Sequence, residues 1–267
     1  MNATTIGVFD SGFGGLTVLR ELLPLIPGAH YLYLGDTARL PYGSKSQTTI
    51  ARYAVESARF LESHGADHLV IACNTASALA LREIQDSVRI PVTGVIEPVV
   101  DATHRRHPDS EVLVLATSAT VQSHAYRDQC AGRGIHATEK ACPLLVPLVE
   151  EGWIDNSITS DVIRVYLREA LSNRSPEAVL LGCTHYPLIA SAIEAVLHEL
   201  GSKAEVMDSA RATAIAIERA IHLSLPRSAG AATFQCYATD SVEKFARLGS
   251  QFLGQPIPRV ELLDLGG

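Results

Sequence analysis

The sequence has no excess of basic residues and no long apolar run. Its 22 Lys and Arg residues are outnumbered by 29 Asp and Glu residues, which gives a formal net charge of −7. Binding to nucleic acid or to an anionic membrane needs clustered Lys and Arg, so neither partner is expected. Residues 1–5 lack the basic and apolar segments of a secretory signal, and no apolar stretch approaches transmembrane length. We therefore expect a cytoplasmic protein.

Cysteine is also scarce, and its number, five, is odd. Because the number is odd and no secretory signal is seen, a disulfide framework is not expected. Because no two cysteines are spaced as C-x-x-C, neither a zinc site nor a thioredoxin-like redox site is expected. We expect free thiols and no metal site. Cys130, Cys142 and Cys236 have no polar motif after them and are interpreted as small apolar residues of the interior.

Apolar segments of strand length alternate with segments of helical period along most of the chain. With 267 residues, of which 47% are hydrophobic, the chain is long enough for one large domain or two smaller ones. Alternating strands and helices indicate a mainly parallel sheet covered by helices. The expected strands cover residues 5–9, 30–34, 69–72 and 90–96, and then 111–116, 137–142, 178–181 and 206–207.

The chain contains a similar layout twice. The strand end at Asp10 precedes Cys73 by 63 residues, and the strand end at Thr117 precedes Cys183 by 66 residues. This spacing suggests two copies of one α/β unit.

The last part of the chain is too short to bury a core of its own. It is expected to form a helix, a loop or hinge, a strand, a helix and a strand, at residues 211–223, 225–230, 233–238, 242–253 and 260–265. The simplest arrangement returns this part to the first domain. We expect an α/β fold of two similar doubly wound, mainly parallel-sheet domains related by pseudo-twofold symmetry, with residues 1–98 plus 208–267 in one and 99–207 in the other. The active site is expected in the cleft between them.

Two cysteines stand directly behind expected strands, and both have polar residues after them. Cys73 is followed by Asn-Thr and Cys183 by Thr-His. Ligand groups gather beyond the carboxyl ends of strands in open α/β sheets. A thiol in such a place serves as a nucleophile, a redox group or a general acid and base, depending on its pKa. Two thiols on opposite sides of one cleft suit a reaction that removes a proton from one face of a carbon and returns one to the other face.

Three titratable residues are candidates for assisting such a pair of thiols. Asp10 ends the first strand, His185 stands just behind Cys183, and Glu150 ends an apolar turn. We expect His185 to tune Cys183 and the two acids to assist proton transfer.

The glycine-rich turn at 10–15 has an alternative interpretation. A strand followed by Gly-x-Gly, with the acid Asp36 further on, imitates a dinucleotide fingerprint. However, Thr17 stands where that fingerprint has Gly or Ala, and Asp10 ahead of the turn repels a pyrophosphate. The turn is therefore expected to bring backbone amides near a carboxylate ligand.

Motif-like segments are distributed along residues 6–187. They are Ile6–Leu16 (IGVFDSGFGGL), Leu34–Lys45 (LGDTARLPYGSK), Ala72–Ala76 (ACNTA), Gly94–Pro98 (GVIEP), Pro147–Gly152 (PLVEEG) and Leu181–Pro187 (LGCTHYP). Together, and in this order, they resemble the signature segments of the glutamate racemases. From residue 208 onward the chain resembles that family only in its pattern of elements.

The resemblance implies a cofactor-independent enzyme that interconverts L- and D-glutamate and supplies D-glutamate for peptidoglycan synthesis. It implies that Cys73 handles the proton of D-glutamate and Cys183 that of L-glutamate, with Asp10, Glu150 and His185 as catalytic auxiliaries. The substrate contacts that it implies are Asp10, Ser11, Tyr42, Gly43, Asn74, Thr75, Thr117, Thr184 and His185. Glutamate carries two carboxylates and an ammonium, and these loops offer hydroxyl and amide groups that suit them.

The sequence leaves two alternatives open. An aspartate racemase has the same fold and paired cysteines, and a non-catalytic ligand-binding or partner-inhibiting protein has the fold without the reaction. The expected partner of the chain is glutamate, and we expect a homodimer.

Overall fold

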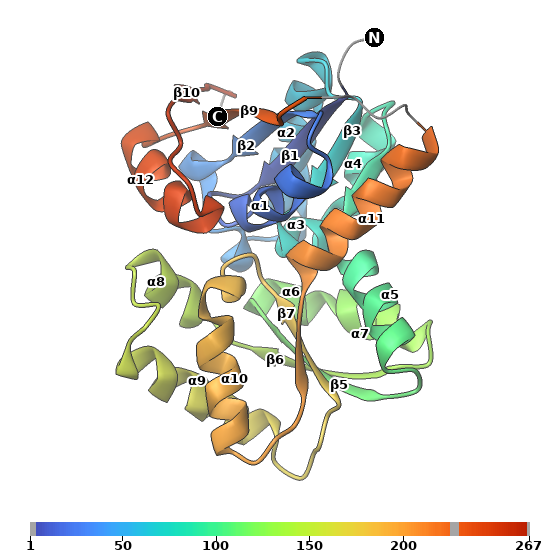
Figure 1. Ribbon diagram of the computed structural model, residues 1–267, viewed down its shortest axis with the longest axis vertical. Helices are drawn as coiled ribbons and strands as arrows, with labels where there is room; N and C mark the ends of the chain where they lie inside the picture. Colours follow the sequence, from blue (N-terminus) through green and yellow to red (C-terminus); the bar gives the residue numbers. More distant parts are fainter. Residues whose placement is uncertain (1–3, 225–229, 266–267) are drawn as a thin grey trace.

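The computed structural model describes residues 4–224 and 230–265, and it contains two β-sheets flanked by helices. Figure 1 shows the sheets in two separate halves of the molecule, with helix α11 (Ser209–Ser224) connecting the lower half to the upper one. Within the described residues, the first sheet has six strands and the second has four. The expected fold of two mainly parallel-sheet α/β domains is confirmed.

The first sheet is built from segments at both ends of the chain. In spatial order its strands are β10 (Val260–Leu262), β9 (Thr233–Ala238), β2 (His30–Gly35), β1 (Thr5–Asp10), β3 (His68–Ile71) and β4 (Val92–Gly94). All neighbouring strands are parallel. Since β1 is covered on both faces, five of its six residues are buried, which explains its continuous apolar run.

The second sheet repeats the arrangement of the first. In spatial order its strands are β6 (His136–Ala141), β5 (Glu111–Ala116), β7 (Ala178–Gly182) and β8 (Glu205–Asp208), again all parallel. In each half the first strand in the chain lies between the second and the third, and the fourth lies outside the third. This shared order is what two copies of one unit produce.

Helices cover both faces of each sheet. Those of the first half are α1 (Leu16–Leu25), α2 (Gln47–Ser63), α3 (Asn74–Leu79), α4 (Leu81–Ser87) and α12 (Val242–Leu253). Those of the second half are α5 (Ile96–Arg106), α6 (Ser118–Ser123), α7 (Ala125–Ala131), α8 (Leu145–Glu150), α9 (Ser157–Ala170) and α10 (Ala190–Glu199). None of the helices in the described part of the chain is long and apolar enough to span a bilayer.

One continuous core cluster joins the two halves. Ile6 and Val8 of β1 belong to it, as do Leu113 of β5 and Leu181 of β7. The next residue of β1, Phe9, points to the other face of the first sheet, into a separate cluster beneath α2. Burial of apolar side chains on both sides of the boundary therefore supports the strand ends that face the space between the sheets.

The last part of the chain returns to the first sheet, as expected. β9 pairs with β2, β10 pairs with β9, and α12 packs against α1. β10 ends at Leu262, three residues earlier than expected. Of the loop expected at 225–230, all but the last residue lies outside the described residues.

Three segments near the strand ends differ from the expected elements. After β3 the helical period of residues 76–88 predicts one helix, but the structure divides it into α3 and α4 at Ala80, whose φ of −140° is not helical. After β5 the sequence predicts a helix around residues 123–130, but a further helix, α6, precedes it, because Thr117 Oγ1 caps that turn by accepting a hydrogen bond from Thr120 N. Glu150 ends helix α8 and not an irregular turn.

Candidate active site

The strand ends of the two sheets bring the two expected cysteines to one cavity. Cys73 follows β3, which pairs with β1, and β1 ends at Asp10. Cys183 follows β7, which pairs with β5, and Thr117 follows β5. Both cysteines line a cavity of about 450 Å³ whose walls come from both halves. A cavity of this size encloses a small molecule.

Most of the site residues expected from the sequence line this cavity. They are Ser11, Tyr42, Gly43, Cys73, Asn74, Thr75, Thr117, Glu150, Cys183, Thr184 and His185. Asp10 is the exception, because it is 1% exposed and is not part of the cavity wall. The structure therefore brings the expected residues together but keeps Asp10 in the layer behind them.

Cys73 is held in a setting that keeps its proton in place. Its Sγ lies 3.4 Å from Ser11 Oγ and accepts a hydrogen bond from the Ala76 amide at 3.5 Å, as the N-cap of α3. Burial and the nearby charge of Asp10 raise the pKa of Cys73 to about 12, although these hydrogen bonds lower it in part. At neutral pH Cys73 is therefore a thiol until a positive charge or a proton acceptor approaches it.

Asp10 is buried beneath the glycine-rich turn. Its Oδ2 accepts the Gly12 amide at 2.8 Å, while Oδ1 has no partner among the described residues. Burial raises the pKa of Asp10, and the charge of His185 and the amides of Gly12 and Gly15 lower it in part. These two amides serve the carboxylate of Asp10, while Ser11, Gly12 and Phe13 of the same turn line the cavity. The expectation that the turn brings backbone amides near a carboxylate ligand stays a prediction.

The second cysteine lies at one end of a chain of polar contacts. Cys183 Sγ is 3.9 Å from His185 Nδ1, and His185 Nε2 is 3.2 Å from Glu150 Oε1. Thr184 Oγ1 also lies 3.4 Å from His185 Nδ1. Glu150 comes from helix α8, so the helix end orients the imidazole toward the sulfur.

The charge state of His185 follows from this chain. Burial lowers its pKa, but hydrogen bonds and charges from Cys183 and Glu150 outweigh burial and raise the pKa to about 10. His185 is therefore an imidazolium at neutral pH. This places a positive charge beside Cys183, with His185 Nδ1 3.9 Å from the sulfur.

Hydroxyl and amide side chains connect the two halves across the cavity. Thr75 Oγ1 lies 3.1 Å from Thr117 Oγ1 and 3.2 Å from Thr120 Oγ1. Tyr126 of α7 donates a hydrogen bond of 2.6 Å to Asn74 Oδ1, which leaves the buried Asn74 Nδ2 without a partner in the described structure. Asn74 lines the cavity, but this unpaired nitrogen is itself buried within the cavity wall.

Tyr42 is positioned from behind. Its hydroxyl donates a hydrogen bond of 2.5 Å to Asp36 Oδ2, and Asp36 also accepts from Arg39 Nε and from Thr239 Oγ1. The Tyr42 side chain is thus engaged away from any ligand, and burial followed by the charge of Asp36 raises its pKa. Tyr42 also lines the cavity, and its expected contact with the substrate stays a prediction.

The glycine-rich turn also touches the loop behind Cys183. Thr17 Oγ1 donates to the Thr184 carbonyl at 3.2 Å. A Cβ on Gly14 would lie 2.3 Å from Thr184 Oγ1 and 2.7 Å from His185 Nδ1. Only glycine fits at position 14, so the first half directly supports the histidine of the second half.

Several cavity residues were not expected from the sequence. Phe13, Lys45, Gln122, Pro143 and Val146 line it, and Tyr126 and Thr120 support its wall. Their residue types carry no specific chemical signal. Two of them stand in segments with a weaker signal. Thr120 belongs to a polar cluster that follows a strand, and Lys45 belongs to a loop with many polar groups.

The arrangement supplies two thiols, a cation beside one of them and neutral donors between them. Within the described ranges, no group of three His, Cys, Asp or Glu side chains is arranged to hold a metal ion. General acid–base chemistry by the thiols is the reaction that these groups can perform by themselves.

Comparison with known proteins defines the class. The family model of the Asp/Glu/Hydantoin racemases matches residues 6–217, and this chain belongs to that family of racemases. Within it the chain is grouped with the glutamate racemases. It is 48% identical to the glutamate racemase of Koribacter versatilis over 98% of both chains.

Solved structures show the same grouping. The glutamate racemase of Thermus thermophilus, solved in complex with β-chloro-D-alanine, is 40% identical and has a TM-score of 0.88 over 98% of this chain and 97% of that one. The glutamate racemase of Francisella tularensis, solved in complex with D-glutamate, is 32% identical and has a TM-score of 0.90 over 99% of both chains.

Proposed function

We propose that this protein interconverts L- and D-glutamate by a cofactor-independent two-base mechanism and thereby supplies D-glutamate for peptidoglycan synthesis. The observation that carries the proposal is the presence of Cys73 and Cys183 in the wall of one cavity, at the ends of strands from different sheets. The likeness to glutamate racemases over nearly the whole chain supports glutamate as the substrate.

In the proposed reaction the two cysteines act on opposite faces of the α-carbon. With D-glutamate, the thiolate of Cys73 removes the α-proton, and the carbanion takes a proton from the thiol of Cys183. The product is L-glutamate, and the cysteines have exchanged protonation states. The reverse reaction begins with Cys183 as thiolate and Cys73 as thiol, so one site serves both directions.

The auxiliary residues adjust these protonation states. His185, held by Glu150, supports the thiolate of Cys183. Asp10 assists Cys73 from the layer behind it, since the charge of its buried carboxyl group acts on that thiol. A substrate ammonium near Cys73 adds a positive charge that favours its thiolate.

The substrate is held by neutral donors. We assign this role to the hydroxyls of Ser11, Thr75, Thr117 and Thr184, the side chain of Asn74, and the backbone of Tyr42 and Gly43. Neutral donors bind a carboxylate without neutralising it through a proton, and in an enclosed cavity their contacts are strong.

Hydrogen isotope exchange tests the proposed function. L-Glutamate incubated in deuterium oxide without pyridoxal phosphate is expected to lose optical rotation and to yield D-glutamate that carries deuterium at the α-position. Polarimetry and mass spectrometry follow both events in one sample. Racemisation without deuterium in the product contradicts the two-base scheme, and no racemisation at all favours a non-catalytic binding protein.

The choice between glutamate and aspartate is tested in the same assay. The expected kcat/KM is higher for glutamate, because the chain is grouped with glutamate racemases along nearly its full length. Faster turnover of aspartate contradicts the proposal and favours the aspartate racemase alternative.

The contact between His185 and Glu150 predicts a pH dependence. Because the pKa of His185 is raised to about 10, kcat/KM for L-glutamate is expected to fall as the pH rises through that value and the imidazolium is lost. Glu150→Gln removes a contact that raises this pKa, so its alkaline fall is expected about 1 pH unit or more lower. The measurement is a pH–rate profile from pH 7 to 11 for both proteins.

Glu151 provides a matched control for that experiment. It is the neighbouring acid, is exposed and does not line the cavity. Glu151→Gln should leave the alkaline limb where it is in the parent protein. A profile for Glu150→Gln that superimposes on that of Glu151→Gln removes Glu150 from its proposed role.

Domain limits of 1–98 plus 208–267 and 99–207 remain part of the proposal. They are supported by the pairing of β9 with β2 and of β8 with β7, which assign the chain segments to different sheets. Expression of residues 99–207 alone, followed by measurement of cooperative unfolding, tests whether this segment is a domain.

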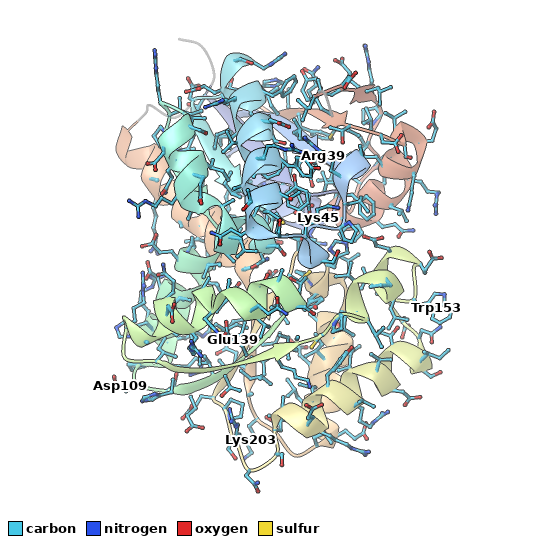
Figure 2. All side chains as sticks on the ribbon, turned by 180° about the vertical axis from the view of Figure 1, so that it is seen from behind. Arg39, Lys45, Asp109, Glu139, Trp153 and Lys203 are labelled. Atoms are coloured by element: carbon cyan, nitrogen blue, oxygen red, sulfur yellow. The ribbon has the colours of Figure 1, made fainter. Side chains whose placement is uncertain are left out.

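We propose a homodimer as the assembled state. Large apolar side chains are exposed on and around α8 and α9, namely Leu144, Trp153, Ile158 and Val165. Figure 2 shows Trp153 at the outer edge of the second half. Grouped exposed apolar residues are typical of interaction surfaces. Sedimentation equilibrium measures the assembled mass, and a monomer at micromolar concentration contradicts this proposal.

We also propose that the protein works in the cytoplasm. The support is that all five cysteines are free thiols, a state favoured in a reducing compartment. Fractionation of the source cells with an antibody to the protein tests the location.

A further inference from the structure

Lys45 lines the cavity and takes no part in the proton transfers proposed above. The charged side chains of the cavity wall are Lys45, Glu150 and His185. Glu150 and His185 are engaged with each other at 3.2 Å. Among the described residues, no carboxylate forms an ion pair with Lys45, so its ammonium is the uncommitted charge of the wall.

The loop that carries Lys45 contains a hydrogen-bonded turn and approaches the second half of the molecule. The Lys45 amide donates to the Tyr42 carbonyl at 3.0 Å and closes the 3₁₀ turn Tyr42–Ser44. A Cβ on Gly43 would lie 3.1 Å from Thr117 Cβ, so this loop reaches the second half of the molecule. Lys45 is only half-buried, which leaves its long side chain free to move at the edge of the cavity.

Arg39, a second cation in the same loop, has a different situation. Its guanidinium is bound to Asp36 and to Glu56, and its side chain is only 12% exposed. Figure 2 shows Lys45 closer to the second half than Arg39. Arg39 therefore stabilises the loop from behind, while Lys45 is the cation available to a ligand.

The charge of Lys45 favours the binding of a negatively charged substrate. Glutamate has two carboxylates and one ammonium and so carries a net negative charge, while the protein has a formal net charge of −7. The net negative charge of the protein repels the substrate. A cation at the edge of the cavity makes the local electrostatic potential favourable for a negatively charged substrate.

We propose that Lys45 is a specificity-determining residue whose ammonium recognises the side-chain carboxylate of the substrate. This inference rests on the proposed function for the identity of the substrate. Lys45 attracts amino acids with a second carboxylate and gives no such advantage to their uncharged amide analogues. Because it binds a part of the substrate that does not react, its loss acts on KM and leaves kcat nearly unchanged.

Calorimetric titration with two substrate-like probes tests this inference independently of turnover. Glutarate carries two carboxylates, and glutaramate carries one carboxylate and one amide of nearly the same shape. For Lys45→Gln the Kd of glutarate is expected to rise about tenfold, while the Kd of glutaramate changes less than about twofold. Lys45→Arg keeps the charge and should retain most of the preference for glutarate.

Lys203→Gln is the matched control, since Lys203 is exposed and lies in the loop before β8, outside the cavity. It should leave both Kd values unchanged. Equal losses for the two probes in Lys45→Gln, or a loss as large in Lys203→Gln, overturn the inference. If glutarate binding behaves as expected but glutamate is not racemised, the proposed function fails while the recognition role of Lys45 stands.

With glutamate as substrate, Lys45→Gln is expected to raise KM about tenfold, with kcat within about twofold of the parent value. A fall in kcat with KM unchanged contradicts a role in recognition.

Discussion

Replacement of either Cys73 or Cys183 by serine is expected to lower the rate of racemisation by about 10²- to 10⁴-fold in both directions. Each thiol is needed in both directions, once as base and once as acid, and a serine hydroxyl is too weak an acid for either task. The measurement is the initial rate of change in optical rotation with L- and with D-glutamate. Parental turnover in both single variants contradicts the two-base assignment.

The two variants also distinguish which face each cysteine serves. Cys183→Ser retains Cys73, so exchange of the α-hydrogen of D-glutamate with solvent is expected to exceed its conversion to L-glutamate. Cys73→Ser should show the corresponding behaviour with L-glutamate. The opposite pattern keeps the pair but reverses the assignment of the faces.

Cys236→Ala is the control for the loss of a buried thiol. Cys236 is buried in β9 and does not line the cavity. This variant should retain racemisation at temperatures where it is folded, and thermal unfolding identifies that range. Similar losses of activity in all three variants point to damage to the fold and not to chemistry.

The sequence predicted the parts of the site that depend on strand ends. Cys73, Thr117 and Cys183 each follow an apolar run, and parallel pairing brings the carboxyl ends of adjacent strands to one edge. The spacing between these residues was also sufficient to predict two units. The sequence did not predict how the two sheets are oriented relative to each other, because this orientation depends on packing contacts spread over many residues.

Side-chain direction was the other limit. Asp10 and Tyr42 stand in motifs that predict ligand contact, yet Asp10 is buried beneath its own turn and Tyr42 donates to Asp36. Both contacts are local, spanning two and six residues of the chain, and both follow from the path of the backbone, which the residue types alone do not define. Lys45 is the opposite case, because nothing in its residue type predicts ligand contact, yet its loop brings it to the wall of the cavity.

Gly14 carries the second large expected effect, because it is the point where the first half supports the histidine of the second. Gly14→Ala places a Cβ 2.3 Å from Thr184 Oγ1 and 2.7 Å from two atoms of the His185 ring unless the loop moves. Relief of the clash requires the Thr184 hydroxyl and the His185 ring, or the turn itself, to move, and movement of the ring displaces the imidazole from Cys183. Since misplacement of a catalytic group by about 1 Å can cost about 10²-fold, kcat is expected to fall by about that factor.

The pH at which activity falls distinguishes a displaced histidine from a weakened fold. Gly132→Ala is the matched control, because its φ of −62° is helical and the nearest atoms to an added Cβ are at an ordinary 3.6 Å. We expect this control to keep the parental kcat, and Gly14→Ala to lose the alkaline limb near pH 10 that His185 produces. Displacement of His185 from Cys183 and Glu150 removes the contacts that raise its pKa, so the limb moves to lower pH. A Gly14→Ala enzyme with reduced kcat but an unmoved limb shows that the imidazole kept its place and that the turn acts on the cavity by another route.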